Sequence, residues 1–307
     1  MHILARDLQF PEGPVAMADG SVILVEIATS TVTRVASDGS KQKLAQLPGG
    51  VNGAAIGPDG RLYLCNNGGF EWIRENGTLR PYGQANDYRG GGIDVLNLKT
   101  GESSRLYEQV PSSSGNHALK GPNDLVFDRH GGFWFTDLGK RRERDMDRGF
   151  VYYASIDGTQ IREVIGPLVT PNGIGLSPDG KTLYVAETET ARLWSWQITA
   201  PGEVEKRPWP APAGATLVAG IGGFNRFDSL AVAASGNICI ATLHAGAIVE
   251  IWPDGSRVRY HPMPDLGVTN ICFGGADMRT AYVTLSHEGR LAAMQWHEPG
   301  LRLNFQD

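Results

Sequence analysis

The chain has 307 residues and a formal net charge of −5, which argues against a general nucleic-acid binder because such proteins usually carry a basic patch. Its 40 glycines and 18 prolines follow no Gly-X-Y period, which excludes a collagen-like chain. The N-terminal segment lacks the long apolar core of a signal peptide, and no apolar run approaches the ~18 residues of a membrane helix. We therefore expect a cytoplasmic protein that binds neither membranes nor nucleic acids, as a monomer or weak oligomer.

A strand-turn-strand unit recurs along the chain. Each copy has a polar residue, a short apolar strand, a turn and a second apolar strand. The six copies occupy residues 10–26, 51–66, 121–137, 170–188, 226–242 and 268–284. Several of the turns are Asp-Gly, a strong hairpin signal because glycine accepts the positive φ of a primed turn. They include Asp19-Gly20, Asp59-Gly60 and Asp179-Gly180.

The spacing of the copies predicts an all-β, six-bladed β-propeller with four-stranded blades, formed as one domain over residues 1–307. A blade of four strands and its turns needs about 40–50 residues, so each copy supplies two strands and a later hairpin supplies the others. A strand near Ile3 is expected to pair with the last blade and close the ring, since closure removes exposed edges. The long gap between the second and third copies holds an insertion, and its Ser-rich part, residues 110–121, is expected to loop over one face.

Three cysteines lie in apolar, strand-like runs: Cys65, Cys239 and Cys272. An odd number of cysteines in a chain of this size does not suggest a disulfide framework. We expect all three to be small buried side chains.

The polar residue of each copy is the main candidate for function. Innermost strands line the central channel of a propeller, so equivalent positions in different blades converge on one axis. The six residues at this position are Glu12, Asn52, Asn123, Asn172, Asp228 and Asn270. Carboxylate and amide oxygens suit hard cations, so we expect one divalent cation, with Ca²⁺ favoured and Zn²⁺, Mn²⁺ or Mg²⁺ as alternatives. The competing interpretation is that these residues cap strands and turns.

The motifs FPEGP, GPNDLVFD, TPNGIGLSPDG, LYVAET and FDSLAV occur in this order along the chain. They resemble those of the senescence marker protein/gluconolactonase family, which includes regucalcin and many bacterial lactonases. The resemblance spans essentially the whole chain and implies a six-bladed propeller with a catalytic divalent metal at one end of its channel. Matching motifs imply that Glu12, Asn172 and Asp228 are metal ligands and that Asn123 contacts metal or substrate. After Asp228 the chain has Ser229, where glycine is common in the family.

One departure concerns the substrate. Gly121 stands where sugar-lactone members often carry an arginine that can bond substrate hydroxyls. This change favours a small lactone with few hydroxyl groups, and aldonolactones are a close second. An arginine of the insertion, such as Arg89, could replace the missing one. The candidate substrate contacts are Gly121, Asn123, Phe224, Trp72 and His117, with Phe70 and His244 as further candidates near strand ends. Asp137 is expected to cap a turn or else to line the pocket.

The resulting hypothesis is a metal-dependent hydrolase that opens γ- or δ-lactones. Asp228 is the candidate general base for water, and Glu12 is chiefly a ligand. The alternative enzyme is a phosphotriesterase-like hydrolase that uses the same ring of six polar residues. The non-enzymatic alternative is a propeller that only binds a partner or ligand. The chain has neither a G-x-S-x-G elbow nor an H-E-x-x-H motif, which argues against an α/β-hydrolase and a zincin.

Overall fold

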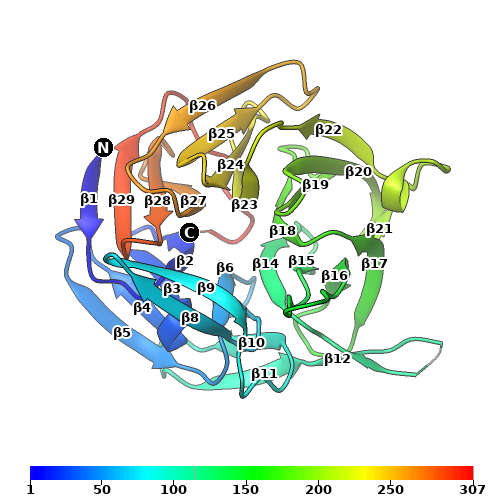
Figure 1. Ribbon diagram of the computed structural model, residues 1–307, viewed down its shortest axis with the longest axis horizontal. Coiled ribbons are helices and arrows are strands. Elements are labelled where there is room, and N and C mark those ends of the chain that lie inside the picture. The colour runs from blue at the N-terminus through cyan, green and yellow to red at the C-terminus, as the bar shows by residue number, and fades with distance from the viewer. Residues whose placement is uncertain (114, 307) are drawn as a thin grey trace.

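A computed structural model describes residues 1–113 and 115–306 of the chain. Within these residues six sheets of antiparallel strands are arranged radially around a central channel (Figure 1). The fold is thus the predicted six-bladed β-propeller, and its blades are numbered here along the chain. Ser114, in the Ser-rich part of the insertion, lies outside the described residues. No helix among the described residues is long and apolar enough to cross a membrane.

The first three blades contain the following strands, from the innermost outward. Blade 1 is β2 (Pro11–Ala16), β3 (Val22–Glu26), β4 (Thr31–Val35) and β5 (Lys41–Gln46). Blade 2 is β6 (Val51–Ile56), β7 (Leu62–Asn66), β10 (Gly92–Leu96) and β11 (Ser103–Tyr107). Blade 3 is β14 (Pro122–Phe127), β15 (Phe133–Asp137), β16 (Gly149–Ala154) and β17 (Ile161–Leu168).

The last three blades follow the same plan. Blade 4 is β18 (Pro171–Leu176), β19 (Thr182–Glu187), β20 (Arg192–Ala200) and β22 (Thr216–Gly220), with the short β21 (Glu203–Val204) also paired to β20. Blade 5 is β23 (Arg226–Val232), β24 (Ile238–Leu243), β25 (Ala247–Ile251) and β26 (Val258–Pro262). Blade 6 is β27 (Val268–Gly274), β28 (Thr280–Leu285), β29 (Arg290–Gln295) and β1 (His2–Ala5). Two short 3₁₀ turns, η1 (Ile27–Thr29) and η2 (Pro212–Gly214), complete the regular elements outside the insertion.

The N-terminal strand closes the ring as predicted. β1 pairs antiparallel with β29, and Ile3 lies opposite Ala292. Blade 6 therefore takes three strands from the end of the chain and its outermost strand from the beginning. This pairing covers an edge of β29 that would otherwise present unpaired backbone groups.

The repeated turns form as the sequence pattern predicts. Gly20, Gly60 and Gly180 have φ of +81°, +72° and +71°, conformations that residues with a Cβ rarely adopt. The preceding aspartate accepts a backbone N–H bond two residues on; Asp19 Oδ1, for example, lies 2.9 Å from the nitrogen of Ser21. Each turn thus joins the two inner strands of its blade.

Apolar side chains fill the spaces between neighbouring blades. Trp134 of β15 and Trp196 of β20, for example, belong to one buried cluster between blades 3 and 4. The three cysteines are buried and free, as predicted. Because each blade is covered on both faces by its neighbours, the second strand of a blade is a nearly continuous apolar run, as in VILV at residues 22–25.

The insertion of blade 2 forms two hairpins. The first is β8 (Phe70–Glu75) with β9 (Thr78–Gln84), and the second is β12 (Gln109–Val110) with β13 (His117–Ala118). The nitrogen of Leu79 donates to the carbonyl of His287, which follows β28, so the first hairpin lies beside the loop that joins β28 to β29. The second hairpin contacts β17, the outermost strand of blade 3.

Candidate functional site

The predicted polar ring lies at the start of the innermost strands, where each strand has a β-bulge. The register of pairing shifts between Glu12 and Val15, and similar shifts occur in the other five inner strands. A bulge leaves an extra residue unpaired and re-aims side chains, which is why bulges are frequent next to functional sites. Two consecutive residues of such a strand can therefore both face the channel. The ring residues Glu12, Asn52, Asn123, Asn172, Asp228 and Asn270 are all buried.

Three buried carboxyl groups influence one another electrostatically at this end of the channel. Burial raises the pKa of Glu12 well above its usual value, and the negative charges of Asp228 and Asp124 raise it further. Burial likewise raises the pKa of Asp228, with an additional contribution from Asp124. The pKa of Asp124 is raised to about 7, chiefly because the group is removed from water. Such a group of carboxyls is costly to ionise unless a cation or protons neutralise it.

Asp124 was not among the residues predicted from the sequence. It directly follows Asn123, and simple strand alternation would place the two side chains on opposite faces. The register shift between Pro122 and Leu125 breaks that alternation. The signal in the sequence is the pair of polar residues in GPNDLVFD, and the bulge allows the second of them, Asp124, to line the channel cavity.

Hydrogen bonds hold several ring residues in place. Glu12 Oε2 accepts from the backbone nitrogen of Gly13 and from Asn270 Nδ2, each at 2.8 Å. Asn172 Nδ2 donates to Thr188 Oγ1 at 3.1 Å, and Ser229 Oγ lies 3.4 Å from Asn172 Oδ1. Ser229 therefore has a contact within the ring that glycine could not make. Glycine is the more common residue at this position in the family that the motifs resemble.

Asn123 carries the clearest sign of a missing partner. Its Oδ1 atom is buried and has no hydrogen-bond partner among the described residues. A buried polar atom without a partner costs about 1–3 kcal/mol, so such atoms are uncommon unless a ligand completes them. An unpartnered amide oxygen beside buried carboxyls fits the donor set of an oxygen-preferring cation. The residues that could hold it are Glu12, Asn123, Asn172 and Asp228, with Asp124 adjacent.

Phe224 lies at the rim of this end of the propeller, shortly before β23. Its side chain is 71% exposed and stacks on His244, with ring centroids 4.5 Å apart. Arg226, at the start of β23, lies 5.7 Å from the Phe224 ring and forms an ion pair with Glu189 at 3.0 Å. Arg226 is only two residues before Asp228, and sequence reasoning did not select it.

Trp72 lies on the β8–β9 hairpin rather than on a blade. Its ring is 5.0 Å from that of Phe10, two residues before Glu12, and 6.0 Å from that of Phe70. The hairpin thus places aromatic side chains beside the beginning of β2. His117 is located elsewhere: its Nε2 is 3.4 Å from Tyr152 Oη and 3.7 Å from Glu163 of β17, the outermost strand of blade 3. The structure does not bring His117 to the ring.

Gly121 is tightly packed. A Cβ at this position would lie 2.4 Å from the carbonyl oxygen of Gly139. The absence of a side chain at Gly121 therefore frees no space for a substrate, because backbone already fills that space. Asp137 explains the close approach: its carboxylate accepts backbone N–H bonds from Lys120, Gly121 and Gly139 at 2.7–2.9 Å. This confirms the turn-capping role expected for Asp137.

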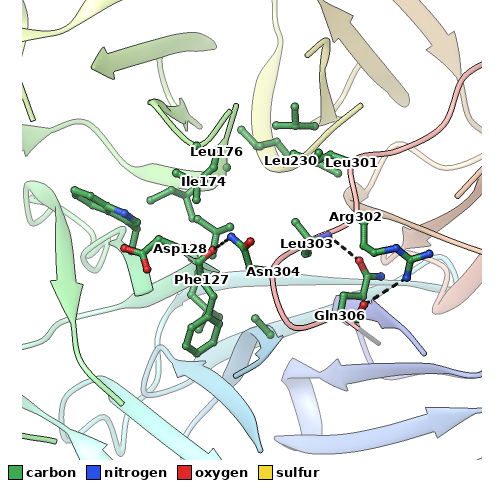
Figure 2. Close-up of a pocket in the computed structure, with 18 of the residues that line it drawn as sticks. Phe127, Asp128, Ile174, Leu176, Leu230, Leu301, Arg302, Leu303, Asn304 and Gln306 are labelled. Carbon is green, nitrogen blue, oxygen red and sulfur yellow. Dashed lines mark hydrogen bonds between the residues drawn. The ribbon is translucent and has the colours of Figure 1, made fainter. Parts of the chain in front are cut away.

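A cavity of about 1010 Å³ runs along the channel from the polar ring to the opposite end, and Figure 2 shows part of its lining. Its lining extends from turn residues between inner strands, such as Asp128 and Lys181, to Asp124 and the ring residue Asn270. The C-terminal segment, residues 301–306, crosses it. Asn304 Nδ2 donates to the carbonyl of Phe127 at 2.9 Å, and Gln306 Nε2 donates to that of Phe273 at 3.0 Å. The cavity therefore reaches the polar ring from the turn side of the channel, where the C-terminal segment lies across it.

The fold and the ring together define the class: a six-bladed propeller with an acidic, oxygen-rich site at one end of its channel. The profile of the SMP-30/Gluconolactonase/LRE-like region matches residues 10–287. The chain therefore belongs to this family, as the sequence motifs indicated.

Individual relatives agree with this assignment. The "Lactonase drp35" of Staphylococcus haemolyticus is 31% identical over 255 residues, which cover 82% of this chain and 69% of that protein. The "Gluconolactonase" of Zymomonas mobilis is 23% identical over 320 residues, covering 94% of this chain and 79% of that protein. These relatives support a lactonase-type enzyme.

Solved structures show the same fold. A gluconolactonase of Xanthomonas campestris superposes with a TM-score of 0.73 at 20% identity, covering 95% of this chain and 88% of that one. A structure from Agrobacterium tumefaciens described as a calcium-binding protein, regucalcin, gives 0.72 at 19% identity, covering 98% and 97%. At such identities the likeness concerns the fold alone.

Proposed function

We propose that this protein is a divalent-cation-dependent lactonase that hydrolyses small γ- or δ-lactones to hydroxy acids. The observation that carries the proposal is the buried group of Glu12, Asp124 and Asp228 beside the unpartnered Oδ1 of Asn123. Three mutually repelling carboxyls and an unsatisfied amide oxygen destabilise the fold unless a cation neutralises the carboxyls and binds the oxygen. Membership of a family with relatives named lactonase supplies the reaction class.

Glu12, Asn123, Asn172 and Asp228 would hold the cation, with Ca²⁺ favoured by the all-oxygen donors and Zn²⁺, Mn²⁺ or Mg²⁺ as alternatives. Among the described residues, both hydrogen bonds to Glu12 go to Oε2, which leaves Oε1 for a cation. The cation would supply Lewis-acid polarisation of the lactone carbonyl. Asp124 would contribute negative charge close to the site without being required as a ligand.

Asp228 is the proposed general base. A carboxylate oxygen of Asp228 takes a proton from water as the water oxygen bonds to the carbonyl carbon. The proton then passes to the ring oxygen of the lactone as the bond between that oxygen and the carbonyl carbon breaks, and the hydroxy acid leaves. The raised pKa of Asp228 brings its basicity closer to that of a working base at neutral pH, whereas a cation lowers it. Glu12 has no proton-transfer role in this scheme.

The residues around the site favour a lactone with few hydroxyl groups, and aldonolactones remain the close second. Gly121 offers no side chain to a sugar hydroxyl, and buried hydroxyls without partners cost about 1–3 kcal/mol each. Phe224 and the hairpin residue Trp72 would instead contact an alkyl-substituted ring. Arg226 is the polar group at the rim that could serve a more hydroxylated substrate.

The test is a hydrolysis assay with and without a chelator against three substrates: an aldonolactone, an aliphatic γ-lactone and an aryl phosphotriester. We expect chelator-sensitive hydrolysis of lactones, restored by adding the cation, and a higher kcat/KM for the γ-lactone. A clear preference for the aldonolactone would overturn the substrate proposal only. Preference for the phosphotriester would favour the alternative hydrolase, and no turnover of any substrate would favour a binding propeller.

A further inference from the structure

A second group of potential metal ligands lies far from the channel, between blades 5 and 6. Glu250 is on β25, His261 is on β26 of the same blade, and His297 follows β29 of the next blade. One ligand atom from each residue lies within 4.8 Å of the others. The strands β25 and β26 are on the outer side of blade 5 (Figure 1). We propose that this group binds one divalent transition-metal ion, with Zn²⁺ as the best-matched ion.

The distances within the group suit a four-coordinate ion. His261 Nε2 is 2.9 Å from Glu250 Oε2, and His297 Nε2 is 3.2 Å from Glu250 Oε1. Zn–N bonds of about 2.0–2.1 Å in a tetrahedral site place ligand atoms about 3.3–3.4 Å apart, close to these separations. Small rotations of three side chains would therefore suffice. Two imidazoles and one carboxylate are a ligand set typical of zinc with an open fourth position.

The carboxylate of Glu250 is buried, and a bound cation would balance its charge. The Glu250 side chain is 0% exposed, while those of His261 and His297 are partly accessible, at 20% and 41%. A metal could thus enter from the histidine side and meet a carboxylate that is already oriented. Asn237 Nδ2 donates to Glu250 Oε1 at 2.8 Å, which holds that carboxylate as outer-shell partners do in metal sites.

Two further charged groups border the site. Glu298 Oε1 lies 3.6 Å from His297 Nε2 and is close enough to serve as a fourth ligand after a side-chain rotation. Arg259 opposes a cation, since its Nη1 is 3.6 Å from Glu250 Oε2. Its side chain is 39% exposed, so the guanidinium can move into solvent when a metal arrives. Each imidazole would exchange a hydrogen bond to Glu250 for a bond to the metal, with loss of any proton on Nε2.

Such an ion would join blade 5 to the beginning of the C-terminal segment. His297 and Glu298 directly precede the residues that pair with Ala233 and then cross the cavity at the turn side of the channel. The ion would therefore tie down this segment, in addition to the strand pairing that closes the ring. This role does not depend on the reaction at the polar ring.

The test separates this site from the polar ring by removing the ring's ligands first. In a Glu12→Gln/Asp228→Asn background, titration with Zn²⁺ is followed by calorimetry, and titration with Co²⁺ by the visible absorption of four-coordinate cobalt. We expect one bound ion, a cobalt spectrum with histidine ligation, and a Zn²⁺-dependent rise in Tm. Adding His261→Gln and His297→Gln should abolish all three. The control His2→Gln, at an exposed histidine on β1, should abolish none.

A background that binds no ion, or an ion retained after both histidines are replaced, would overturn the proposal. If the background does not fold, the wild-type protein saturated with Ca²⁺ is titrated with Co²⁺ instead, with Glu250→Gln as the loss variant. If Zn²⁺ leaves Tm unchanged, the three residues form an ion-pair network and not a metal site. Loss of lactonase activity plays no part in these readouts.

Discussion

Asn270 Nδ2 donates a hydrogen bond to Glu12 Oε2 at 2.8 Å, although 258 residues separate the two in the chain. Glu12 is on the innermost strand of blade 1 and Asn270 is on that of blade 6, so the bond spans the junction where the ring closes. The pairing of β1 with β29 secures the same junction at the periphery. Closing the ring therefore both completes the fold and orients a carboxylate of the polar ring.

Asp228→Asn should abolish cation binding at the ring and reduce kcat/KM for the preferred lactone by about 10²–10⁴-fold, the range typical of a lost general base. The substitution keeps the size of the side chain but removes its charge and basicity. The measurement combines isothermal titration with Ca²⁺ and an initial-rate assay. Asp254→Asn, in the turn between β25 and β26, is the control and should be silent in both. Normal turnover by Asp228→Asn would remove Asp228 from the mechanism.

Asn123→Leu tests the unpartnered amide oxygen. It should weaken cation affinity by at least about 10-fold, because even the loss of a residue that only hydrogen-bonds to a metal ligand lowers affinity by about 10–100-fold. Without cation it should not lower Tm, because an unsatisfied buried oxygen is exchanged for an apolar group of similar shape. Asn172→Leu is the contrast: it breaks contacts with Thr188 and Ser229 and should lower Tm with or without cation. Equal destabilisation by both variants would mean that Asn123 has a structural role only.

The buried carboxyls predict how stability varies with pH. The folded-state pKa values of Glu12, Asp124 and Asp228 are raised, so between the unfolded values near ~4 and the folded values the native state binds more protons. These groups therefore make the cation-free protein less stable as pH rises through that window, to about 7 for Asp124. A bound cation replaces the protons and removes this penalty.

The gain in Tm on adding Ca²⁺ should thus be larger at pH 8 than at pH 5, and calorimetry in buffers of different ionisation enthalpy should detect proton release on binding. The Asp124→Asn variant, which lacks one of the three carboxyls, should show a weaker pH dependence of the gain. A gain that is the same at both pH values would contradict the assignment of these carboxyls to the cation site.

Gly121→Arg, which introduces the arginine common in sugar-lactone members, should destabilise the protein rather than improve turnover of aldonolactones. Even Gly121→Ala should cost about 1–3 kcal/mol, as other overpacked sites do, because its Cβ would lie 2.4 Å from the carbonyl oxygen of Gly139. Gly222→Ala is the matched control, since a Cβ there meets open space. Chemical denaturation measures the differences. A stable Gly121→Arg variant with increased gluconolactone turnover would show that the backbone can shift to admit the side chain.

Much of the fold is determined by local patterns in the sequence. Apolar alternation and Asp-Gly turns specify hairpins within a few residues, and six copies of one hairpin imply six blades because each blade needs a neighbour on both faces. The ring of polar residues follows from this repeat alone, since equivalent positions converge on the channel. All six ring residues are indeed buried at the start of inner strands.

Other features were decided only by the tertiary structure. The bulge in β14 turns Asp124 inward against the alternation of a regular strand. The close approach of Gly139 leaves Gly121 no space, and the second hairpin of the insertion places His117 against Tyr152 and Glu163 of blade 3. Glu250, His261 and His297 meet only because blade 5 packs beside the end of blade 6. Strands and turns depend on neighbours in the chain, whereas these contacts depend on how separate blades are packed, which no local pattern records.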